Sequence, residues 1–244
     1  MQYIFIPLYK EVVDIKPVIL LTANFDDQKE LYTINRKYCR IIEKCGAVPV
    51  IMPYISAKNT EFLLKKASAV LLTGGGDISP HIAGIEQIVF SRGCNGIRDS
   101  FEINLCRYCY IKGVSIMGIC RGMQIMCVAA GGSICEDISL FSETAHNHIQ
   151  AIDKKLPSHK VYIKHNSILH GVAKKDSIYV NSLHHQCVEE SGFLTVSARS
   201  KDGVIEAVEG CKKALFMGFQ WHPEQCLYGG YSEKIFKFFI DNCR

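Results

Sequence analysis

VSIMGICRGMQIMCVAA, residues 114–130, passes directly from a strand pattern into a helix pattern. Residues 114–119 are a short, mostly apolar run, which is typical of a strand that is buried on both faces. Residues 123–130 are predicted to form a helix, and the glycine pair that follows ends it. The GICRG joint has small residues on both sides of Cys120, so the chain can turn sharply there. The pattern therefore predicts a strand, a tight turn that presents the cysteine, and a helix.

The remainder of the first half alternates between strand and helix patterns in the same way. Apolar runs predict further strands at residues 17–22, 48–52 and 69–73, and apolar periodicity predicts helices at residues 38–45, 60–66 and 100–111. Asp99, with Glu102 three residues later, is interpreted as the capping pair that opens the last of these helices. Such alternation predicts parallel strands, right-handed crossovers and helices on both faces of the sheet.

The second half has a different pattern, of short β-rich runs separated by Gly, Asp or Ser turns. These runs lie at residues 160–164, 177–180, 194–198, 204–208 and 215–220. A last amphipathic helix begins at Ser232, and its apolar face is formed by Ile235, Phe236, Phe239 and Ile240. No repeat or linker divides the chain, so residues 1–244 are predicted to form a single α/β domain. Its sheet is expected to be mostly parallel, with an added antiparallel portion in the C-terminal half.

The composition argues against several classes of protein. The 244 residues are 48% apolar and 21% charged, as in an ordinary globular protein, and the net charge is only +4. Lys and Arg are scattered, which argues against a nucleic-acid partner. No run approaches the ~18 apolar residues of a membrane span, and no cleavage site follows the short apolar run near the N-terminus. Twelve cysteines in a long chain without an export signal favour reduced thiols in the cytoplasm.

The histidine and cysteine spacings do not predict a metal site. Cys106 and Cys109 have C-x-x-C spacing, but no second pair or nearby histidine pair completes a zinc site. His184 and His185 are adjacent, and adjacent side chains of a strand point to opposite faces. The HNH run at residues 146–148 resembles a nuclease motif only in its letters. We therefore expect neither a metal ion nor a cofactor.

Cys120 has the sequence surroundings of a nucleophile. The dipole of the following helix favours a thiolate and lowers a cysteine pKa from its usual value of about 8.5, and Arg121 adds a positive charge nearby. A cysteine nucleophile also needs a base, and FQWHPE, residues 219–224, supplies His222 with Glu224 two residues later. The carboxylate can orient the imidazole and stabilise its charged form. The sequence therefore predicts a triad of Cys120, His222 and Glu224.

Two turns are candidates for stabilising an oxyanion. The GGGD turn at residues 74–77 and the CRG turn at residues 120–122 each follow a predicted strand directly. Ligands of parallel sheets bind beyond such strand ends. The backbone N–H groups of Gly75 and Arg121 are therefore expected to converge on the oxyanion of a tetrahedral intermediate.

Several motifs together resemble one family. GICRGMQ and GFQWHPE resemble the class I glutamine amidotransferase superfamily, which has a flavodoxin-like sheet and a Cys-His-Glu triad. LLTGGGDISP, IRDSFE, AAGGSICEDI, VNSLHHQ and DGVIEAVE resemble the gamma-glutamyl-gamma-aminobutyrate hydrolase family, and they cover roughly residues 17–240. The chain departs from the family pattern at the turn that begins with His81 and at Cys135. The resemblance implies oxyanion roles for Gly75 and Arg121, and it implies a group of polar residues near the substrate: Gln124, Asn181, Ser182, His184 and Gln186.

The resemblance implies hydrolysis of a small gamma-glutamyl amide, such as gamma-glutamyl-gamma-aminobutyrate, through a thioester on Cys120. The alternative is a glutaminase component that delivers ammonia to a separate synthetase, which we favour less because no synthetase domain is fused to the chain. A non-catalytic binding protein is a third interpretation, against which the complete Cys-His-Glu set argues. The expected partner is a small-molecule substrate, and the sequence leaves a homodimer and a docked synthetase open.

Overall fold

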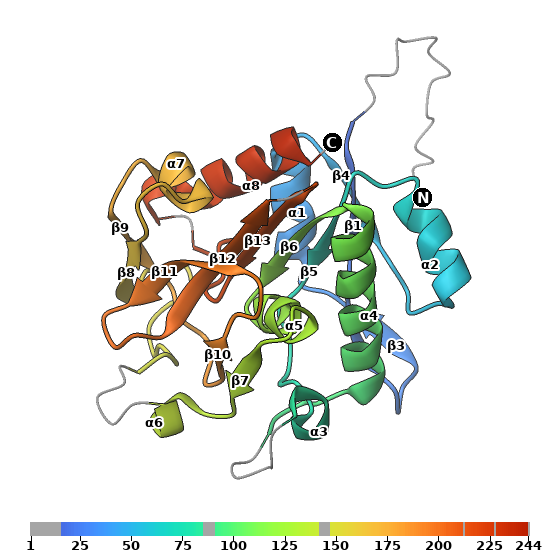
Figure 1. The fold of residues 1–244 in the computed structure, drawn as a ribbon, viewed down its shortest axis with the longest axis horizontal. Helices are drawn as coiled ribbons and strands as arrows, with labels where there is room; N and C mark the ends of the chain where they lie inside the picture. Colours follow the sequence, from blue (N-terminus) through green and yellow to red (C-terminus); the bar gives the residue numbers. More distant parts are fainter. Residues whose placement is uncertain (1–15, 85–90, 142–146, 212, 227, 244) are drawn as a thin grey trace, which may run out of the picture.

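A computed structural model gives the structure of the chain and describes residues 16–84, 91–141, 147–211, 213–226 and 228–243. Within these residues, nine strands form one continuous sheet (Figure 1). Five neighbouring strands are parallel: β4 (Val48–Ile51), β1 (Val18–Leu21), β5 (Ala69–Leu72), β6 (Ser115–Ile119) and β13 (Leu215–Phe219). Antiparallel strands extend the sheet beyond β13: β12 (Ile205–Cys211), β11 (Thr195–Ser200), β8 (His159–Ile163) and β9 (Ser177–Val180). The predicted mixed sheet is confirmed.

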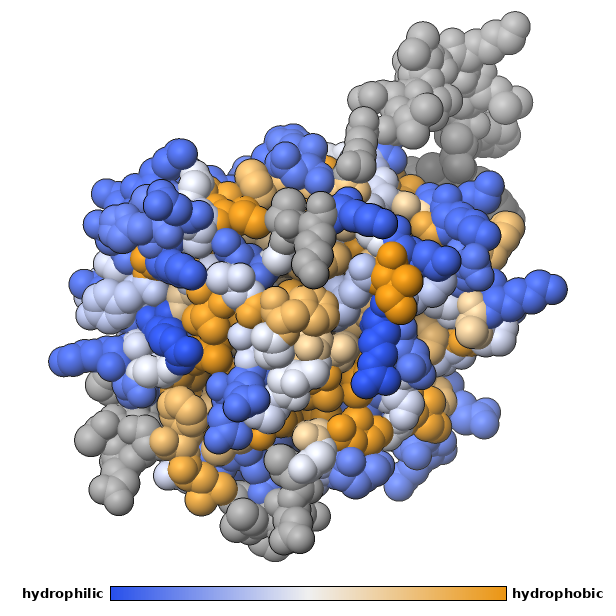
Figure 2. All heavy atoms as spheres, in the orientation of Figure 1, coloured by the Kyte–Doolittle hydropathy of each residue, from blue (hydrophilic) through white to orange (hydrophobic). Residues whose placement is uncertain are grey.

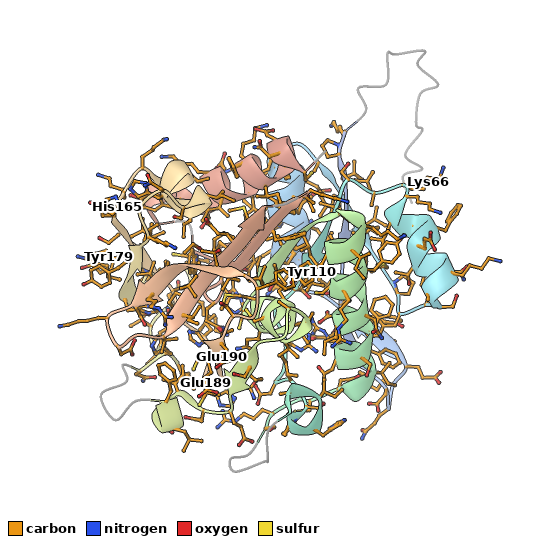
Figure 3. The ribbon with its side chains drawn as sticks, viewed as in Figure 1. Lys66, Tyr110, His165, Tyr179, Glu189 and Glu190 are labelled. Atoms are coloured by element: carbon orange, nitrogen blue, oxygen red, sulfur yellow. The ribbon has the colours of Figure 1, made fainter. Side chains whose placement is uncertain are left out.

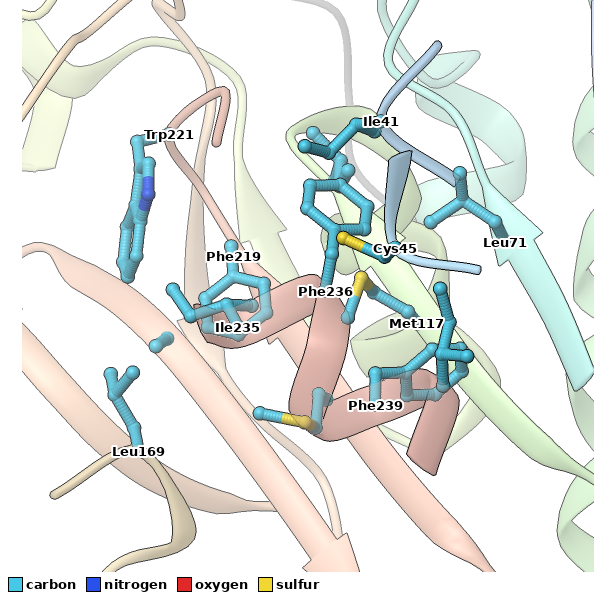
Figure 4. Close-up of a cluster of buried hydrophobic side chains, with 14 of the residues drawn as sticks. Ile41, Cys45, Leu71, Met117, Leu169, Phe219, Trp221, Ile235, Phe236 and Phe239 are labelled. Carbon is cyan, nitrogen blue, oxygen red and sulfur yellow. The ribbon is translucent and has the colours of Figure 1, made fainter. Parts of the chain in front are cut away.

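Alternating side chains of the parallel strands explain why helices cover both faces of the sheet. Ile19 and Leu21 of β1 pack in one buried cluster, whereas Leu20 between them packs in another. The first cluster is covered by α1 (Arg36–Lys44), α7 (Ile168–Ala173) and α8 (Tyr231–Asn242). The second is covered by α2 (Ala57–Leu64), α4 (Gly96–Lys112) and α5 (Arg121–Ala129). Figure 4 shows Phe236 and Phe239 of α8 near Met117 of β6 in the first cluster.

Short elements lie around this core, and the sequence does not predict them because three or four residues are too few to show a period. They are two strand pairs and three short helical segments: β2 (Asn24–Asp26) with β3 (Leu31–Thr33), β7 (Ser133–Cys135) with β10 (Cys187–Glu190), α3 (Pro80–Ala83), α6 (Ile138–Phe141) and the 3-10 turn η1 (Tyr228–Gly230). The β7–β10 pair brings the segment after α5 beside the segment after β9.

The predicted strands of the main sheet agree with the observed ones within three residues at each end, but the predicted start of α4 is wrong. The helix begins at Gly96, and the Asn95 side chain caps it by accepting from the Arg98 N–H over 2.9 Å. Asp99 and Glu102 do not cap the helix, because both are buried in its first turns against arginine side chains. Their spacing matches a capping pair only locally.

Charged and apolar residues are interspersed over the face of the molecule in Figure 2. The long helix α4 has 17 residues and carries charged side chains at both ends. Among the residues that the structure describes, no helix is long and apolar enough to cross a membrane.

Candidate active site

The turn between β6 and α5 holds Cys120 in a strained backbone conformation. Its φ is 53° and its ψ is −111°, a region that residues with side chains rarely adopt. A Cβ on Gly118 would lie 2.5 Å from the carbonyl group of Gly122, and a Cβ on Gly122 would lie 2.3 Å from the Leu72 carbonyl oxygen. The two glycines of the G-x-C-x-G pattern are therefore required by close backbone contacts on both sides of the turn.

His222 reaches Cys120 because β13 lies beside β6 in parallel, so both strands end at the same edge of the sheet. The Cys120 N–H donates to the Phe219 carbonyl oxygen over 2.7 Å, and the side chains of His222 and Cys120 lie against the same residue, Gly74. His222 Nδ1 lies 2.8 Å from Glu224 Oε1. An ionised carboxylate only accepts, so Nδ1 is the donor and Nε2 is left for the cysteine. The structure thus brings the three predicted triad residues together.

The surroundings of His222 favour its charged form. Burial disfavours the charge, but Glu224 and Cys120 outweigh burial and raise the pKa of His222 to about 10. The three residues are only 5 to 8% exposed, so water screens their interactions little. This arrangement can hold a proton on the imidazole beside the Cys120 sulfur.

The glycine loop after β5 lies against the side chains of both Cys120 and His222. A Cβ on Gly74 would lie 2.9 Å from His222 Cε1 and 3.6 Å from Cys120 Cβ, so glycine leaves room for the imidazole there. Gly75 is exposed. Neither its backbone N–H nor that of Arg121 has an acceptor among the described residues. Both donors are therefore available to a ligand near the sulfur.

Arg98, which the sequence analysis does not identify, holds the glycine loop in place through hydrogen bonds to its backbone. Its Nη2 donates to the Thr73 carbonyl oxygen over 2.8 Å and to the Gly74 carbonyl oxygen over 3.3 Å. Its Nε donates to Glu102 over 2.9 Å. A Cβ on Gly75 would lie 2.2 Å from Arg98 Nη1. Glycine at this position therefore lets the loop rest directly on the guanidinium.

The Arg121 side chain joins the same buried network. It forms ion pairs with Asp99 and Glu102, and all three side chains are at most 2% exposed. Asp99 Oδ2 also accepts from the Ser79 N–H over 3.0 Å. The expectation that Arg121 adds a positive charge near the sulfur needs correction, because two carboxylates compensate that charge. The guanidinium instead ties the nucleophile turn to α4.

The five polar residues predicted near the substrate are all buried and bind other parts of the protein. Asn181 Oδ1 accepts from the His222 N–H over 3.0 Å, which fixes the backbone of the base. Gln124 Nε2 donates to Gln220 Oε1 over 3.2 Å, and Gln220 Nε2 lies 3.6 Å from Cys120 Sγ. Asn181 and Gln124 thus lie one or two contacts from the triad.

Ser182, His184 and Gln186 form hydrogen bonds with residues outside the triad. Ser182 Oγ is 3.2 Å from His148 Nδ1, and His184 Nδ1 donates to the Gln186 carbonyl oxygen over 3.0 Å. Gln186 Oε1 accepts from the Ile78 N–H over 3.3 Å. Gln186 Nε2 is buried and has no hydrogen-bond partner among the described residues.

The two departures from the family pattern have different surroundings. His81 is exposed in α3. Cys135 of β7 lies opposite Cys187 of β10 in the strand register. A hydrogen bond from Cys187 lowers the pKa of Cys135 to about 7, against the opposing effect of burial. Cys135 is therefore a second thiol with reactive character.

Known proteins resemble this chain in sequence and in fold. The model of the family described as Peptidase C26 matches residues 12–224. A gamma-glutamyl-gamma-aminobutyrate hydrolase of Escherichia coli O157:H7 is 31% identical over 222 residues, which cover 87% of each chain. A glutamine amidotransferase-like protein of Lactococcus lactis is 30% identical over 216 residues, covering 87% of this chain and 89% of that protein. The glutaminase domain of Trypanosoma brucei CTPS, solved with bound acivicin, is 16% identical with a TM-score of 0.61, and the match covers 93% of this chain and 94% of that one.

Proposed function

The chain belongs to the Peptidase C26 family of glutamine amidotransferase-like hydrolases, and from this premise we propose that it cleaves the gamma-glutamyl amide bond of a small compound. In this proposal Cys120 is the nucleophile, His222 the proton carrier and Glu224 the group that orients the base. The observation that carries it is a strained cysteine that lies beside Gly74 together with a histidine, which a carboxylate holds at 2.8 Å.

The first half of the reaction forms a thioester. The Cys120 thiolate attacks the amide carbonyl carbon, and the resulting oxyanion accepts hydrogen bonds from the N–H groups of Gly75 and Arg121. The imidazolium of His222 then gives its proton to the amide nitrogen. The C–N bond breaks, the amine leaves, and the gamma-glutamyl group stays on the sulfur. The raised pKa of His222 supports this order, because it keeps the required proton on the ring.

The second half restores the enzyme. Neutral His222 takes a proton from a water molecule as that water attacks the thioester carbonyl carbon. The same two backbone donors stabilise the second oxyanion. Collapse of this second tetrahedral intermediate breaks the C–S bond and releases glutamate. It also restores the thiolate–imidazolium pair of Cys120 and His222. Side chains, backbone amides and water carry every step, so the mechanism as written uses no cofactor.

The roles of the base and its carboxylate can be separated by substitution. His222→Asn is expected to lower kcat by on the order of 10²-fold or more, because asparagine cannot carry the proton. Glu224→Gln is expected to lower it less, since the glutamine oxygen can still accept from Nδ1. Steady-state assays of both variants in parallel test this order. A larger loss in Glu224→Gln would reverse the two assigned roles.

The substrate class rests on the relatives and on the polar residues below the triad. One relative at 31% identity is a gamma-glutamyl-gamma-aminobutyrate hydrolase. We assign Gln186 to substrate contact, because its buried Nε2 has no partner among the described residues. Asn181 and Gln124 are assigned to the shell that holds His222 and Cys120 in place. Ser182 and His184 are assigned to supporting contacts, with His148 and with the Gln186 carbonyl oxygen respectively.

The second candidate function is a glutaminase component that passes ammonia to a separate synthetase. The fold of the Trypanosoma brucei CTPS glutaminase domain favours it as an alternative, since the two folds agree over most of both chains. Glutaminases of this kind are expected to gain activity when their synthetase docks. We favour the stand-alone hydrolase because Cys120 and His222 already lie together beside Gly74 in the chain without a partner.

A release assay with the isolated chain separates the two functions. The chain is expected to cleave gamma-glutamyl-gamma-aminobutyrate or a similar amide with a kcat/KM of about 10⁴–10⁸ M⁻¹s⁻¹. Glutamine should be a much poorer substrate, because it lacks the leaving-group chain that supplies binding energy. A chain that is inert alone and cleaves glutamine after a synthetase is added would support the alternative. Inactivity in both settings, with reduced thiols, would contradict both functions.

We also propose that residues 1–244 act as one catalytic domain in a reducing compartment such as the cytoplasm. One sheet runs through both halves of the described chain, which supports a single domain. The cysteines whose side chains are described are free thiols, which supports a reducing compartment. A homodimer remains compatible with this function.

A further inference from the structure

A cluster of three histidines and a glutamate lies outside the triad. It is formed by His148, His159 at the start of β8, His184 and Glu206 of β12. Glu206 Oε1 lies 2.9 Å from His159 Nε2 and 3.4 Å from His148 Nδ1. His184 Nε2 lies 3.2 Å from His148 Nδ1 and 3.8 Å from Glu206 Oε1. The four side chains are at most 12% exposed, so water does not separate these atoms.

The spacing of these atoms fits a small tetrahedral metal ion. Bonds of about 2.0–2.1 Å to such an ion place neighbouring ligand atoms about 3.3–3.4 Å apart. The four separations given above, from 2.9 to 3.8 Å, lie on both sides of that value. One ligand atom each from His148, His159 and Glu206 lies within 4.8 Å of the other two. Small shifts of side chains would bring these three atoms to bonding distance of one ion, and His184 Nε2 lies beside two of them, His148 Nδ1 and Glu206 Oε1.

The second nitrogen of each ring is already held, as is usual for histidines that bind metals. His148 Nε2 lies 3.0 Å from Asp202 Oδ2. His184 Nδ1 lies 3.0 Å from the Gln186 carbonyl oxygen, and His159 Nδ1 lies 3.3 Å from Ser158 Oγ. These contacts orient Nδ1 of His148, Nε2 of His159 and Nε2 of His184 toward one another and toward Glu206.

The contacts also leave the centre of the cluster in need of a cation. Because Asp202 and the Gln186 carbonyl accept, neutral His148 and His184 would point two lone pairs at each other over 3.2 Å, and the Ser182 hydroxyl, 3.2 Å from His148 Nδ1, can donate to one of them. Glu206 Oε2 is buried without a hydrogen-bond partner among the described residues. With neutral rings, the buried Glu206 carboxylate adds a negative charge that a cation at the centre of the cluster would balance.

We propose that His148, His159 and Glu206 bind a divalent transition-metal ion, Zn²⁺ by ligand type, with His184 Nε2 at the fourth position. Imidazole nitrogens with one carboxylate suit Zn²⁺, whereas Mg²⁺ and Ca²⁺ prefer oxygen ligands alone. The ligands come from segments that are distant in sequence, so inspection of neighbouring residues such as His184 and His185 does not find them. His184 bonds to Gln186, and Gln124 Nε2 lies 3.3 Å from the same carbonyl oxygen. The ion would therefore fix the polar layer below the triad.

Calorimetric titration of the chelator-treated full chain with Zn²⁺ tests the site. We expect one equivalent to bind to the wild type and Mg²⁺ not to compete. His159→Ala and Glu206→Gln should each lower the affinity for Zn²⁺ more than about 100-fold. Asp202→Asn changes only a supporting contact and should lower this affinity about 10- to 100-fold.

His165→Ala is the matched control. His165, His170 and Asp176 form a second group with metal-ligand spacing, but it is mostly exposed, and His165 lies near α7 in Figure 3. This control should bind as the wild type does.

A cobalt spectrum decides the result even where a variant does not fold. Co²⁺ bound to the wild type should give visible d–d bands of a tetrahedral site without a thiolate charge-transfer band, since the proposed ligands include no cysteine. A thiolate band, loss of binding in His165→Ala, or unchanged binding in both His159→Ala and Glu206→Gln would overturn the proposal. Failure of the wild type to bind Zn²⁺ would also overturn it and leave a proton as the bridging cation. Metal binding is measured without activity, so these outcomes do not depend on the proposed function.

Discussion

Cys120→Ala is expected to abolish turnover of every gamma-glutamyl amide that the wild-type chain cleaves, with a loss in kcat of at least about 10⁴-fold. The substitution removes the sulfur that forms the thioester, and neither His222 nor the Gly75 and Arg121 amides can replace that atom. The fold should persist, because alanine fits the same turn and the flanking glycines are unchanged. Amine release, with circular dichroism and a thermal midpoint for the same sample, checks both statements.

Cys135→Ser is the matched control for this result. Cys135 is the other thiol with reactive character, since the hydrogen bond from Cys187 lowers its pKa to about 7. Iodoacetamide is therefore expected to label both Cys120 and Cys135 in the wild type, while the loss of activity follows labelling of Cys120 alone. Cys135→Ser should be active and should lose activity on labelling at the wild-type rate. Turnover retained in Cys120→Ala would show that the nucleophile is elsewhere.

The sequence is informative about the nucleophile because the geometry there is local. Gly118, Cys120 and Gly122 lie within five consecutive residues, and the close contacts that demand the two glycines arise within one strand–turn–helix unit and its neighbouring strand. His222 and Glu224 are similarly close to each other in sequence. The parallel strands are predictable for a related reason: strands buried on both faces are continuous apolar runs, as β5 and β6 are.

The network that supports the site is not predictable in this way, because its partners meet only in the folded chain. Arg121 lies 22 positions from Asp99 and 19 from Glu102 along the chain. Viewed locally, Asp99 and Glu102 have the spacing of a helix cap, which is how the sequence analysis interprets them. Their burial against arginines follows from the packing of α4 on α5, and no short pattern encodes that packing. The resemblance includes these residues in the IRDSFE motif without assigning them a role.

The roles of the residues predicted near the substrate also depend on contacts that form only in the folded chain. The sequence identifies Asn181 and Gln186 as polar positions close to the active site. It does not distinguish a side chain that binds substrate from one that holds the protein. In the structure, Asn181 binds the His222 backbone. Gln186 Oε1 binds the Ile78 N–H, and its buried Nε2 lacks a partner among the described residues.

Arg121→Met is expected to destabilise the fold by about 3–5 kcal/mol, because removing one partner of a buried ion pair leaves the other charges uncompensated. Asp99 and Glu102 are both fully buried, and Arg121 contacts both. Methionine has a similar length and keeps the backbone N–H, so the change isolates the guanidinium. Urea unfolding at neutral pH measures the difference in unfolding free energy. Lys65→Met is the matched control, since the Lys65–Glu61 pair at 3.0 Å is exposed and its loss should change stability little.

The destabilisation should depend on pH in a direction that Glu102 sets. Burial raises the pKa of Glu102, but Arg121 and Arg98 outweigh burial and hold it below the ordinary value of 4.5. A lowered folded-state pKa contributes stability that is present above the unfolded-state pKa and lost as the pH falls below it. The free energy of unfolding of the wild type should therefore exceed that of Arg121→Met most clearly above about pH 5. This difference in unfolding free energy should become smaller on further acidification, as Glu102 takes up a proton. The prediction is wrong if Arg121→Met lowers the unfolding free energy as little as Lys65→Met does, or if the difference from the wild type grows in acid. Either result would mean that the charges of Asp99 and Glu102 are compensated without Arg121.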